Sequence, residues 1–390
     1  MSKVIGLDIG TSFLIASAKR GKKEIYNTMR DCYFVISGDN DKAIKFAQSA
    51  GVNFIRNEDT NEYYLIGQDA LNFVNLLNTF MSKRDVDKNK EVQLKRPMAQ
   101  GVLNPQDKLG SQMLTILVEG VVQGVQEGDE KGTIYYSVPA NPVDSEFNTI
   151  FHSQKIKKNI TKMGYKANEL NEGLAVIYSE APTTEVDGED VPFTGIGLSM
   201  GGGMVNVCFA YRGMSMMEFS VSRSGDWIDE QVAQVTNTPI PIITKYKEEK
   251  LDFTENTDSD EILSALDIFY RNLVEYVIYH LKRELSGMNE RITYEVPIVI
   301  AGGTSRPKGF KEMFEECIEN EGVPFKVKEI TLSKEPSYAV SRGCLLAALA
   351  EEDETEIISE EKSSSNKGDN DNLEEIFEDD KDLEAMLENL

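Results

Sequence analysis

The sequence predicts an α/β protein of two domains. Its 390 residues exceed the usual size of one domain. Short apolar runs typical of strands alternate with longer segments whose apolar residues recur every three or four positions, as in helices. Two strand–glycine turn–strand units lie far apart, around Gly10 and around residues 201–203. Together these features indicate a duplicated α/β domain.

The elements of the first domain can be followed along the chain. Residues 4–8 and 13–19 are predicted to be two strands joined by a tight glycine-containing turn. Helical spacing of apolar residues predicts a helix over 107–125, and a buried strand is predicted over 133–138. A helix over 144–163 follows, with an aspartate at its start expected to cap it.

The second domain shows a similar succession of elements. Residues 195–199 and 205–211 are predicted strands on either side of the three glycines. A long amphipathic helix is predicted over 262–281, because its apolar residues recur at steps of three or four. A buried strand over 296–301 and a final helix over 337–349 complete the predicted globular body.

Composition narrows the class of function. The formal net charge of -25 argues against direct binding of nucleic acid, which needs clustered Lys and Arg. No apolar run reaches the roughly 18 residues of a transmembrane helix, and residues 1–3 lead directly into a strand without a signal peptide. The cysteines are far apart and fit reduced core residues of a cytoplasmic protein: Cys32, Cys208, Cys317 and Cys344.

The acidic charge is concentrated at the C-terminus. Residues 351–390 contain 17 Asp and Glu against 3 Lys, a net of -14, and residues 1–350 carry the remaining -11. We expect 351–390 to be a disordered acidic tail. Within this acidic tail, apolar residues from Leu373 to Leu390 recur at helical spacing, which also fits a recognition helix for a protein partner. A tail that only confers solubility is the alternative.

The two glycine turns resemble each other residue by residue. Gly6-Leu7-Asp8-Ile9-Gly10 aligns with Gly197-Leu198-Ser199-Met200-Gly201, and each unit ends in an Arg-Gly turn. Glycine lets the backbone turn tightly, and successive N–H groups in such a turn form a concave nest for phosphate. Asp8 could hold Mg²⁺ through water, as this ion prefers. Chance similarity is the alternative, because strand–glycine turn–strand units are common.

Six motifs in order resemble the actin-like ATPase superfamily, which includes actin, the 70-kDa heat-shock chaperones and the sugar kinases. The resemblance covers about residues 3–350 and implies two RNase H-like domains that flank a nucleotide cleft. It implies domain I at 1–145 plus 335–350, and domain II at 146–334. The motifs lie at residues 8–12, 137–140, 198–206, 225–229, 300–306 and 339–343.

The resemblance implies a set of site residues for ATP and Mg²⁺. Asp8 would hold Mg²⁺ through water, and the Arg306 guanidinium would stack on adenine. The residues expected to contact the nucleotide are Asp8, Gly10, Thr11, Ser12, Ser199, Gly201, Gly202, Gly203, Gly225, Asp226, Glu249, Gly302, Gly303, Thr304 and Arg306.

Within the superfamily, the chain is most similar to the prokaryotic filament-forming actins of the MreB and MamK type. Residues 95–103 are similar to their Arg-Pro-x-x-x-Gly-Val segment. Residues 170–175 resemble their Glu-Pro-x-Ala segment, which implies that Glu172 positions the attacking water. A solvated glutamate at a helix start is the alternative for Glu172, and an exposed charged helix face is the alternative for Glu249.

Ser199 departs from the family pattern, which has an aspartate at this point of the second loop. A hydroxyl adds no charge beside Mg²⁺, and phosphoryl transfer depends on positioning and electrostatic stabilisation. The resemblance therefore implies a protein that binds ATP, hydrolyses it slowly and assembles into a homopolymer. A nucleotide-binding scaffold without hydrolysis and a small-molecule kinase on the same fold are the alternatives. A chaperone would need a larger substrate-binding domain than residues 351–390 provide.

Overall fold

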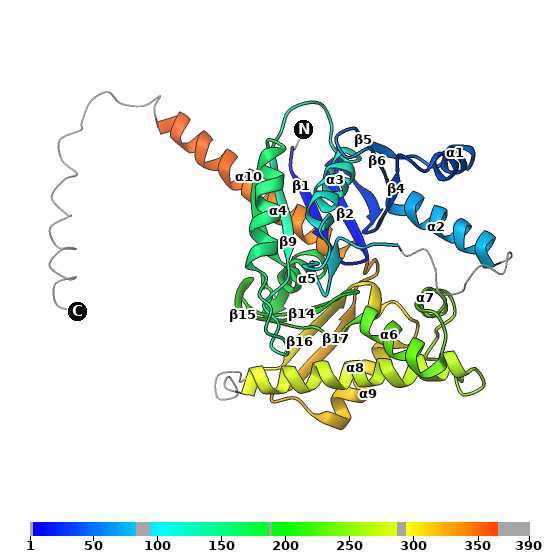
Figure 1. Cartoon of the computed structure of the whole chain (residues 1–390). Coiled ribbons are helices and arrows are strands. Elements are labelled where there is room, and N and C mark those ends of the chain that lie inside the picture. The colour runs from blue at the N-terminus through cyan, green and yellow to red at the C-terminus, as the bar shows by residue number, and fades with distance from the viewer. Residues whose placement is uncertain (1–2, 83–93, 187–188, 287–293, 366–390) are drawn as a thin grey trace. The chain divides into compact units, whose positions relative to one another are not determined.

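The structure is a computed structural model that describes residues 3–82, 94–186, 189–286 and 294–365. The chain is compact through Ala348, and residues from Leu349 onward form a separate unit. Two five-stranded sheets organise the compact part (Figure 1). No helix in the described part of the chain combines the length and the apolar character needed to cross a membrane.

The first sheet has the strand order β10-β9-β1-β2-β3. β1 pairs antiparallel with β2 and parallel with β9. Alternate residues of β1, including Leu7 and Ile9, pack on the same core as Leu117 and Ile156 from two covering helices. The strands are β1 Ile5–Ile9, β2 Phe13–Arg20, β3 Lys23–Arg30, β9 Thr133–Val138 and β10 Lys166–Asn171; the helices are α3 Gly110–Gln123 and α4 Ile150–Lys162.

The second sheet has the order β15-β14-β13-β16-β17. α8 and α9 lie side by side along one face (Figure 1). Cys208 and Val299 pack with residues of α5 on the other face. The strands are β13 Gly195–Met200, β14 Val205–Tyr211, β15 Met214–Val221, β16 Val296–Ala301 and β17 Val327–Leu332; the helices are α5 Glu172–Glu180, α8 Glu261–Leu285 and α9 Phe310–Glu321.

The two sheets share one topology. In each, a three-strand antiparallel meander is followed by a helix, a parallel strand, a helix and a second parallel strand. α5 follows the first sheet and α10, Ala339–Ser365, follows the second. The observed order thus agrees with the duplication that the glycine turns suggested. The boundaries of the two domains stay a prediction.

The remaining elements are insertions into this repeated plan. A three-stranded sheet and two helices follow β3, a short β-ladder precedes α3, a hairpin precedes β13, and two helices follow β15. Their bounds are β4 Tyr33–Ser37, α1 Asp41–Ser49, β5 Ile55–Asn57, β6 Glu62–Ile66, α2 Gly67–Ser82, β7 Met98–Ala99, β8 Val102–Leu103, β11 Thr183–Val186, β12 Glu189–Pro192, α6 Gly225–Thr236, α7 Ile240–Glu249 and the 3-10 turn Gly303–Ser305.

Two helix predictions differ from the structure. α4 begins at Ile150 with Thr149 before it, so the predicted Asp144 cap is wrong. Asp144 instead accepts hydrogen bonds from the Ser222 backbone N–H at 2.9 Å and the Tyr276 hydroxyl at 3.0 Å. α10 is longer than the predicted 337–349, because it continues to Ser365; the rest of the acidic tail lies outside the described residues.

Candidate functional site

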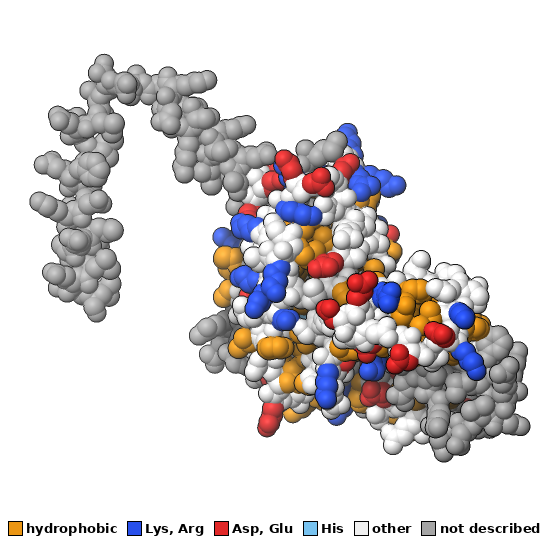
Figure 2. All heavy atoms as spheres, turned by 45° about the horizontal axis from the view of Figure 1, so that its top comes forward, with side chains coloured by type: hydrophobic (Ala, Val, Ile, Leu, Met, Phe, Trp, Pro, Cys, Tyr) orange, Lys and Arg blue, Asp and Glu red, His pale blue; other side chains and the backbone are white. Residues whose placement is uncertain are grey.

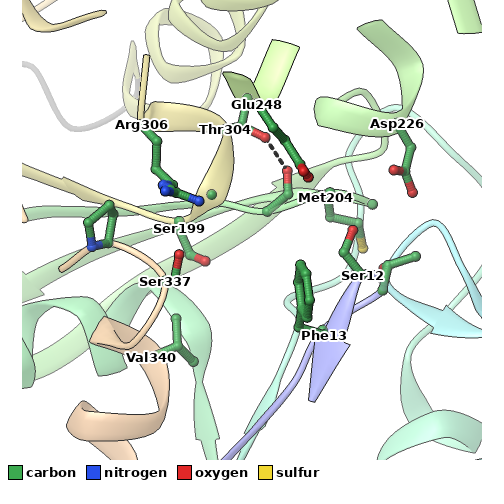
Figure 3. Close-up of a pocket in the computed structure, with 18 of the residues that line it drawn as sticks. Ser12, Phe13, Ser199, Met204, Asp226, Glu248, Thr304, Arg306, Ser337 and Val340 are labelled. Carbon is green, nitrogen blue, oxygen red and sulfur yellow. Dashed lines mark hydrogen bonds between the residues drawn. The ribbon is translucent and has the colours of Figure 1, made fainter. Parts of the chain in front are cut away.

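A cleft of about 270 Å³ brings together segments from both sheets. In Figure 3, Ser12 and Phe13 lie on one side of it, and Thr304 and Arg306 lie on the other. Of the residues predicted to form the site, Gly225 does not line the cleft. Those that do are Asp8, Gly10, Thr11, Ser12, Glu172, Ser199, Gly201, Gly202, Gly203, Asp226, Glu249, Gly302, Gly303, Thr304 and Arg306.

The two glycine turns are closed by the same type of backbone hydrogen bond. The Gly10 N–H donates to the Phe13 carbonyl at 3.0 Å, and the Gly201 N–H donates to the Met204 carbonyl at 3.1 Å. Each turn closes the hairpin that begins its sheet and leaves its intervening backbone at the cleft. The structure therefore places two equivalent turns at one cavity.

The turns approach each other too closely for larger residues. A Cβ atom on Gly203 would lie 2.3 Å from the Thr11 hydroxyl, and one on Gly202 would lie 2.5 Å from the Ser12 hydroxyl. The Thr11 hydroxyl also accepts a hydrogen bond from the Gly101 N–H at 3.0 Å, so the Arg-Pro-x-x-x-Gly-Val segment braces the first turn. Glycine is required here by the close approach of the two loops.

Asp8 is held at the end of β1 by a neighbouring strand. Ser137 of β9 donates its hydroxyl to the Asp8 carboxylate at 3.0 Å, and the same hydroxyl accepts the Ile9 N–H at 3.0 Å. Burial raises the pKa of Asp8 to about 7, against the lowering effect of this hydrogen bond. Ser137 lies in one of the six motifs, but its sequence context did not indicate a role at the site.

Glu172 lies close enough to Asp8 for their charges to interact. It is the first residue of α5, whose N-terminus is capped by Asn171 through bonds from Gly173 and Leu174 at 2.8 and 3.2 Å. Burial, reinforced by the Asp8 charge, raises the pKa of Glu172 to about 8. Ser199 donates its hydroxyl to the Glu172 carboxylate at 3.1 Å. The residue that replaces the family aspartate is thus bonded to the predicted water-positioning residue.

Gly225 supports the second turn from behind. Its N–H donates to the Gly201 carbonyl at 3.3 Å, and the Thr304 hydroxyl donates to the same carbonyl at 2.7 Å (Figure 3). The following N–H, of Asp226, donates to the Gly202 carbonyl at 2.8 Å. A Cβ on Gly225 would lie 2.6 Å from the Thr304 hydroxyl, so this glycine fixes the loop without lining the cleft.

Two ion pairs at the cleft were not assigned from the sequence. Lys247 lies 2.8 Å from the nearly buried Asp229 carboxylate and donates to the Gly225 carbonyl at 2.8 Å. Arg96 lies 3.2 Å from Asp226, across 130 residues of sequence. Arg96, Asp226 and Asp229 lie in motifs identified from the sequence, and Lys247 lies two residues before the predicted Glu249. Each pairing nevertheless joins distant segments that no local pattern connects.

The residues predicted to contact adenosine also line this cleft. Glu249 lines it from the end of α7, together with Glu248, whose carboxylate points into the cleft in Figure 3. Arg306 extends from the turn after β16, and its guanidinium faces the interior of the cleft (Figure 3). The structure thus brings the two candidate sets of contacts, for phosphate and for base, into one cavity.

Comparison with solved structures shows an actin-like fold. The chain superposes on the MamK double helical filament with a TM-score of 0.59 and 16% identity, covering 88% of this chain and 98% of MamK. It superposes on Spiroplasma citri MreB5 bound to AMPPNP with a TM-score of 0.59 and 13% identity, covering 92% and 98%. For MreB5 bound to ADP the TM-score is 0.57 and the identity 14%, and the superposition covers 87% of this chain and 94% of MreB5.

These likenesses confirm the predicted fold class and the resemblance to actin-like filament proteins. A comparison with curated proteins gives no significant match. A family model described as Volactin matches residues 3–348, nearly the whole compact part of the chain. The chain therefore belongs to the volactin family.

Proposed function

We propose that this chain is a cytoplasmic, ATP-binding cytoskeletal protein that assembles into filaments in a nucleotide-dependent way and hydrolyses ATP slowly. The observation that carries the proposal is the pair of equivalent glycine turns at one cleft, around Gly10 and Gly201. Backbone N–H groups in such turns bind phosphate oxygens without needing a positive side chain. Two of them could hold the phosphates of one nucleotide from both sides.

The acidic residues of the cleft suit Mg²⁺ bound together with phosphate. Within the described residues, no group of three or more His, Cys, Asp and Glu could enclose a metal ion. Mg²⁺ does not need such an enclosure, because it keeps several waters and uses one or two carboxylates plus phosphate oxygens. Asp8 would hold the hydrated ion, and the ion would offset the negative charge of the phosphates.

The solved relatives support nucleotide binding and assembly as proposals for this chain. MreB5 was solved with AMPPNP and with ADP, and MamK as a double helical filament. Both have the fold of this chain over most of its length. A head-to-tail contact between identical subunits produces an open filament when the rotation does not close a ring. We also keep, as a proposal, the division into domain I at 1–145 plus 335–350 and domain II at 146–334.

A nucleotide-binding scaffold without hydrolysis is the second candidate, and one observation favours it. Ser199 contributes no charge to the cleft, and its hydroxyl is bonded to Glu172 at 3.1 Å. Glu172 with a raised pKa holds its proton at neutral pH and orients an attacking water poorly as a base. If this arrangement persists with nucleotide bound, binding would occur without turnover.

Nucleotide titration and pelleting with ATP, ADP and no nucleotide test the proposal together. We expect Mg²⁺-dependent ATP binding by calorimetry and pelleted polymer that depends on which nucleotide is present. Asp8→Asn should weaken Mg²⁺-ATP binding by about tenfold or more, since it removes the carboxylate from the ion. Asp59→Asn, an exposed aspartate in a turn, is the matched control and should bind as the wild type does.

The outcomes separate the candidate functions. Assembly without any measurable phosphate release favours the scaffold. Phosphate transfer to a metabolite without assembly would support the small-molecule kinase and contradict the filament proposal. Absence of nucleotide binding in the wild-type chain would contradict both the filament and the scaffold.

A further inference from the structure

Helix α4 carries a charge opposite to that of the whole chain. Its thirteen residues, Ile150–Lys162, contain four lysines and no aspartate or glutamate. The chain as a whole carries a net charge of -25. A basic helix on so acidic a protein is not explained by the nucleotide cleft, because no residue of α4 lines it.

Three lysines and a phenylalanine form a continuous stripe, in which Lys155 is half-buried and the other three side chains are exposed. Phe151, Lys155, Lys158 and Lys162 are spaced by four, three and four residues, which places them on one face of the helix. Phe151 is 68% exposed, the highest value among the exposed large apolar side chains of the described residues. Figure 2 shows Lys and Arg side chains together with hydrophobic ones in the region where Figure 1 places α4. We call this stripe the α4 surface.

The lysines of the α4 surface lack an ion-pair partner in the part of the chain that the structure describes. Among the described residues, no ion pair involves Lys155, Lys158 or Lys162. The opposite face of the helix is buried, because Ile156 and Ile160 pack in the core of the first sheet. The exposed face therefore suits a partner that is acidic and has an apolar residue to place against Phe151 and Ile150.

The C-terminal segment of the chain has this chemistry. Residues 373–390 contain eight Asp and Glu and one Lys. Leu373, Ile376, Leu383, Leu387 and Leu390 recur at spacings that place them along one side of a helix if the segment forms one on binding. A second copy of α4 itself is a poor partner, because two stripes of lysine repel each other.

Chain length favours a second copy as the source of this segment. α10 is helical as far as Ser365, so its part beyond Leu349 is about 25 Å long. Residues 366–372 can extend at most about 25 Å before the segment begins. The segment of the same chain is tethered within this short reach of the helix end, whereas the segment of a neighbouring molecule is not.

We propose that the α4 surface binds the acidic C-terminal segment 373–390 of a second copy of this chain. Lysines would face the carboxylates, and the exposed Phe151 and Ile150 would lie against leucines of the segment. Such a contact would link copies of the chain through their tails. It involves none of the cleft residues, so it does not depend on nucleotide binding.

Photo-cross-linking of the full chain tests the contact directly. A benzophenone amino acid replaces Phe151 in a mixture of ¹⁴N- and ¹⁵N-labelled chains without nucleotide, and the products are mapped by mass spectrometry. We expect mixed-isotope cross-links between the α4 peptide and residues 373–390. The yield should fall in about 1 M salt, where the Debye length is about 3 Å. Cross-links confined to single chains would overturn the proposal.

Charge reversal provides the matched variants. Lys155→Glu, Lys158→Glu and Lys162→Glu together should reduce the cross-link by about tenfold, because exposed charge pairs contribute modestly and add up. Lys22→Glu, Lys42→Glu and Lys45→Glu change the net charge equally at exposed positions elsewhere and should leave the yield intact. Circular dichroism would confirm that both triple variants fold.

Mixing two defective chains makes the test independent of misfolding. The α4 triple variant retains an intact segment, and a Glu374→Lys, Glu375→Lys, Glu378→Lys chain retains an intact α4 surface. Each chain alone should cross-link only weakly, but the mixture should regain the contact between the two copies. Failure of the mixture, or full cross-linking by either chain alone, would overturn the proposal. Binding to anionic lipid vesicles is the competing outcome. If the wild type binds such vesicles without forming the tail cross-link, and the α4 variant does not bind them, the partner is an anionic lipid surface and the proposal is overturned.

Discussion

The two sheets of this protein have the same topology but contribute different chemistry to the cleft. β1 carries Asp8 just before its glycine turn, whereas β13 carries Ser199 at the equivalent position before an equivalent turn. The turn geometry is common to both because the backbone hydrogen bonds require it. The second turn forms with Ser199 in place of an aspartate, so the carboxylate is not needed for the turn to fold. The difference separates what holds the fold from what we propose acts on the phosphate.

The close packing of the first strand in each sheet should break the fold most strongly when it is disturbed. A Cβ on Gly6 would lie 2.1 Å from the Ser341 carbonyl of α10, and one on Gly197 would lie 2.3 Å from the Gly173 carbonyl of α5. Because these are backbone atoms, they cannot move aside cheaply. We expect Gly6→Ala and Gly197→Ala each to lower the free energy of unfolding by about 3 kcal/mol.

Urea denaturation measures this effect, and Gly303→Ala is the control, because a Cβ there would meet no atom within 4 Å. The control should change stability by less than about 1 kcal/mol. If only one of the two test variants is destabilised, the sheets are not equivalent in their packing against α5 and α10.

The pair of acids near the first turn should make stability depend on pH. The folded pKa of Glu172 is about 8 against an ordinary 4.5, so between these values the folded chain holds a proton that the unfolded chain has lost. Stability therefore falls as pH rises through this window, and the loss is complete above about 8. Relative to Glu172→Gln, the wild type should lose about 4 kcal/mol between pH 5 and pH 9.

The measurement is urea denaturation without nucleotide or Mg²⁺ at several pH values. Glu58→Gln, at an exposed position, serves as the control and should follow the wild-type slope. Parallel curves for the wild type and Glu172→Gln would show that Glu172 is ionised in the folded chain at neutral pH. Glu172 would then carry its negative charge in the folded chain, and the raised pKa that distinguishes the acids near the first turn would be absent.

Restoring symmetry at the second turn should have the smallest effect. Ser199→Asp would place a carboxylate opposite Asp8 and remove the hydroxyl bond to Glu172. We expect steady-state ATP hydrolysis to rise by about tenfold, equivalent to about 1.4 kcal/mol of barrier. Ser199→Asn has nearly the same shape without the charge and should give no gain. An unaltered rate in Ser199→Asp would show that Ser199 does not limit turnover.

Local patterns predicted the two glycine turns, because glycine at a tight turn leaves a trace in the sequence. The resemblance to the actin-like superfamily supplied the other predicted residues of the cleft. Neither predicted the Lys247–Asp229 and Arg96–Asp226 pairs, since each pair joins segments brought together only by folding. The same reason explains the error at Asp144. An aspartate before a helical pattern suggests a cap, but its carboxylate bonds instead to residues of β15's end and α8.

The sequence alone determined the duplicated plan, the two turns and the acidic C-terminus, because these depend on residue type and spacing. Only the tertiary structure decided which side chains meet. It placed Ser137 against Asp8, Ser199 against Glu172, and Lys158 and Lys162 of α4 at exposed positions. Such contacts depend on strand order and helix packing, which join residues more than a hundred positions apart as readily as neighbours.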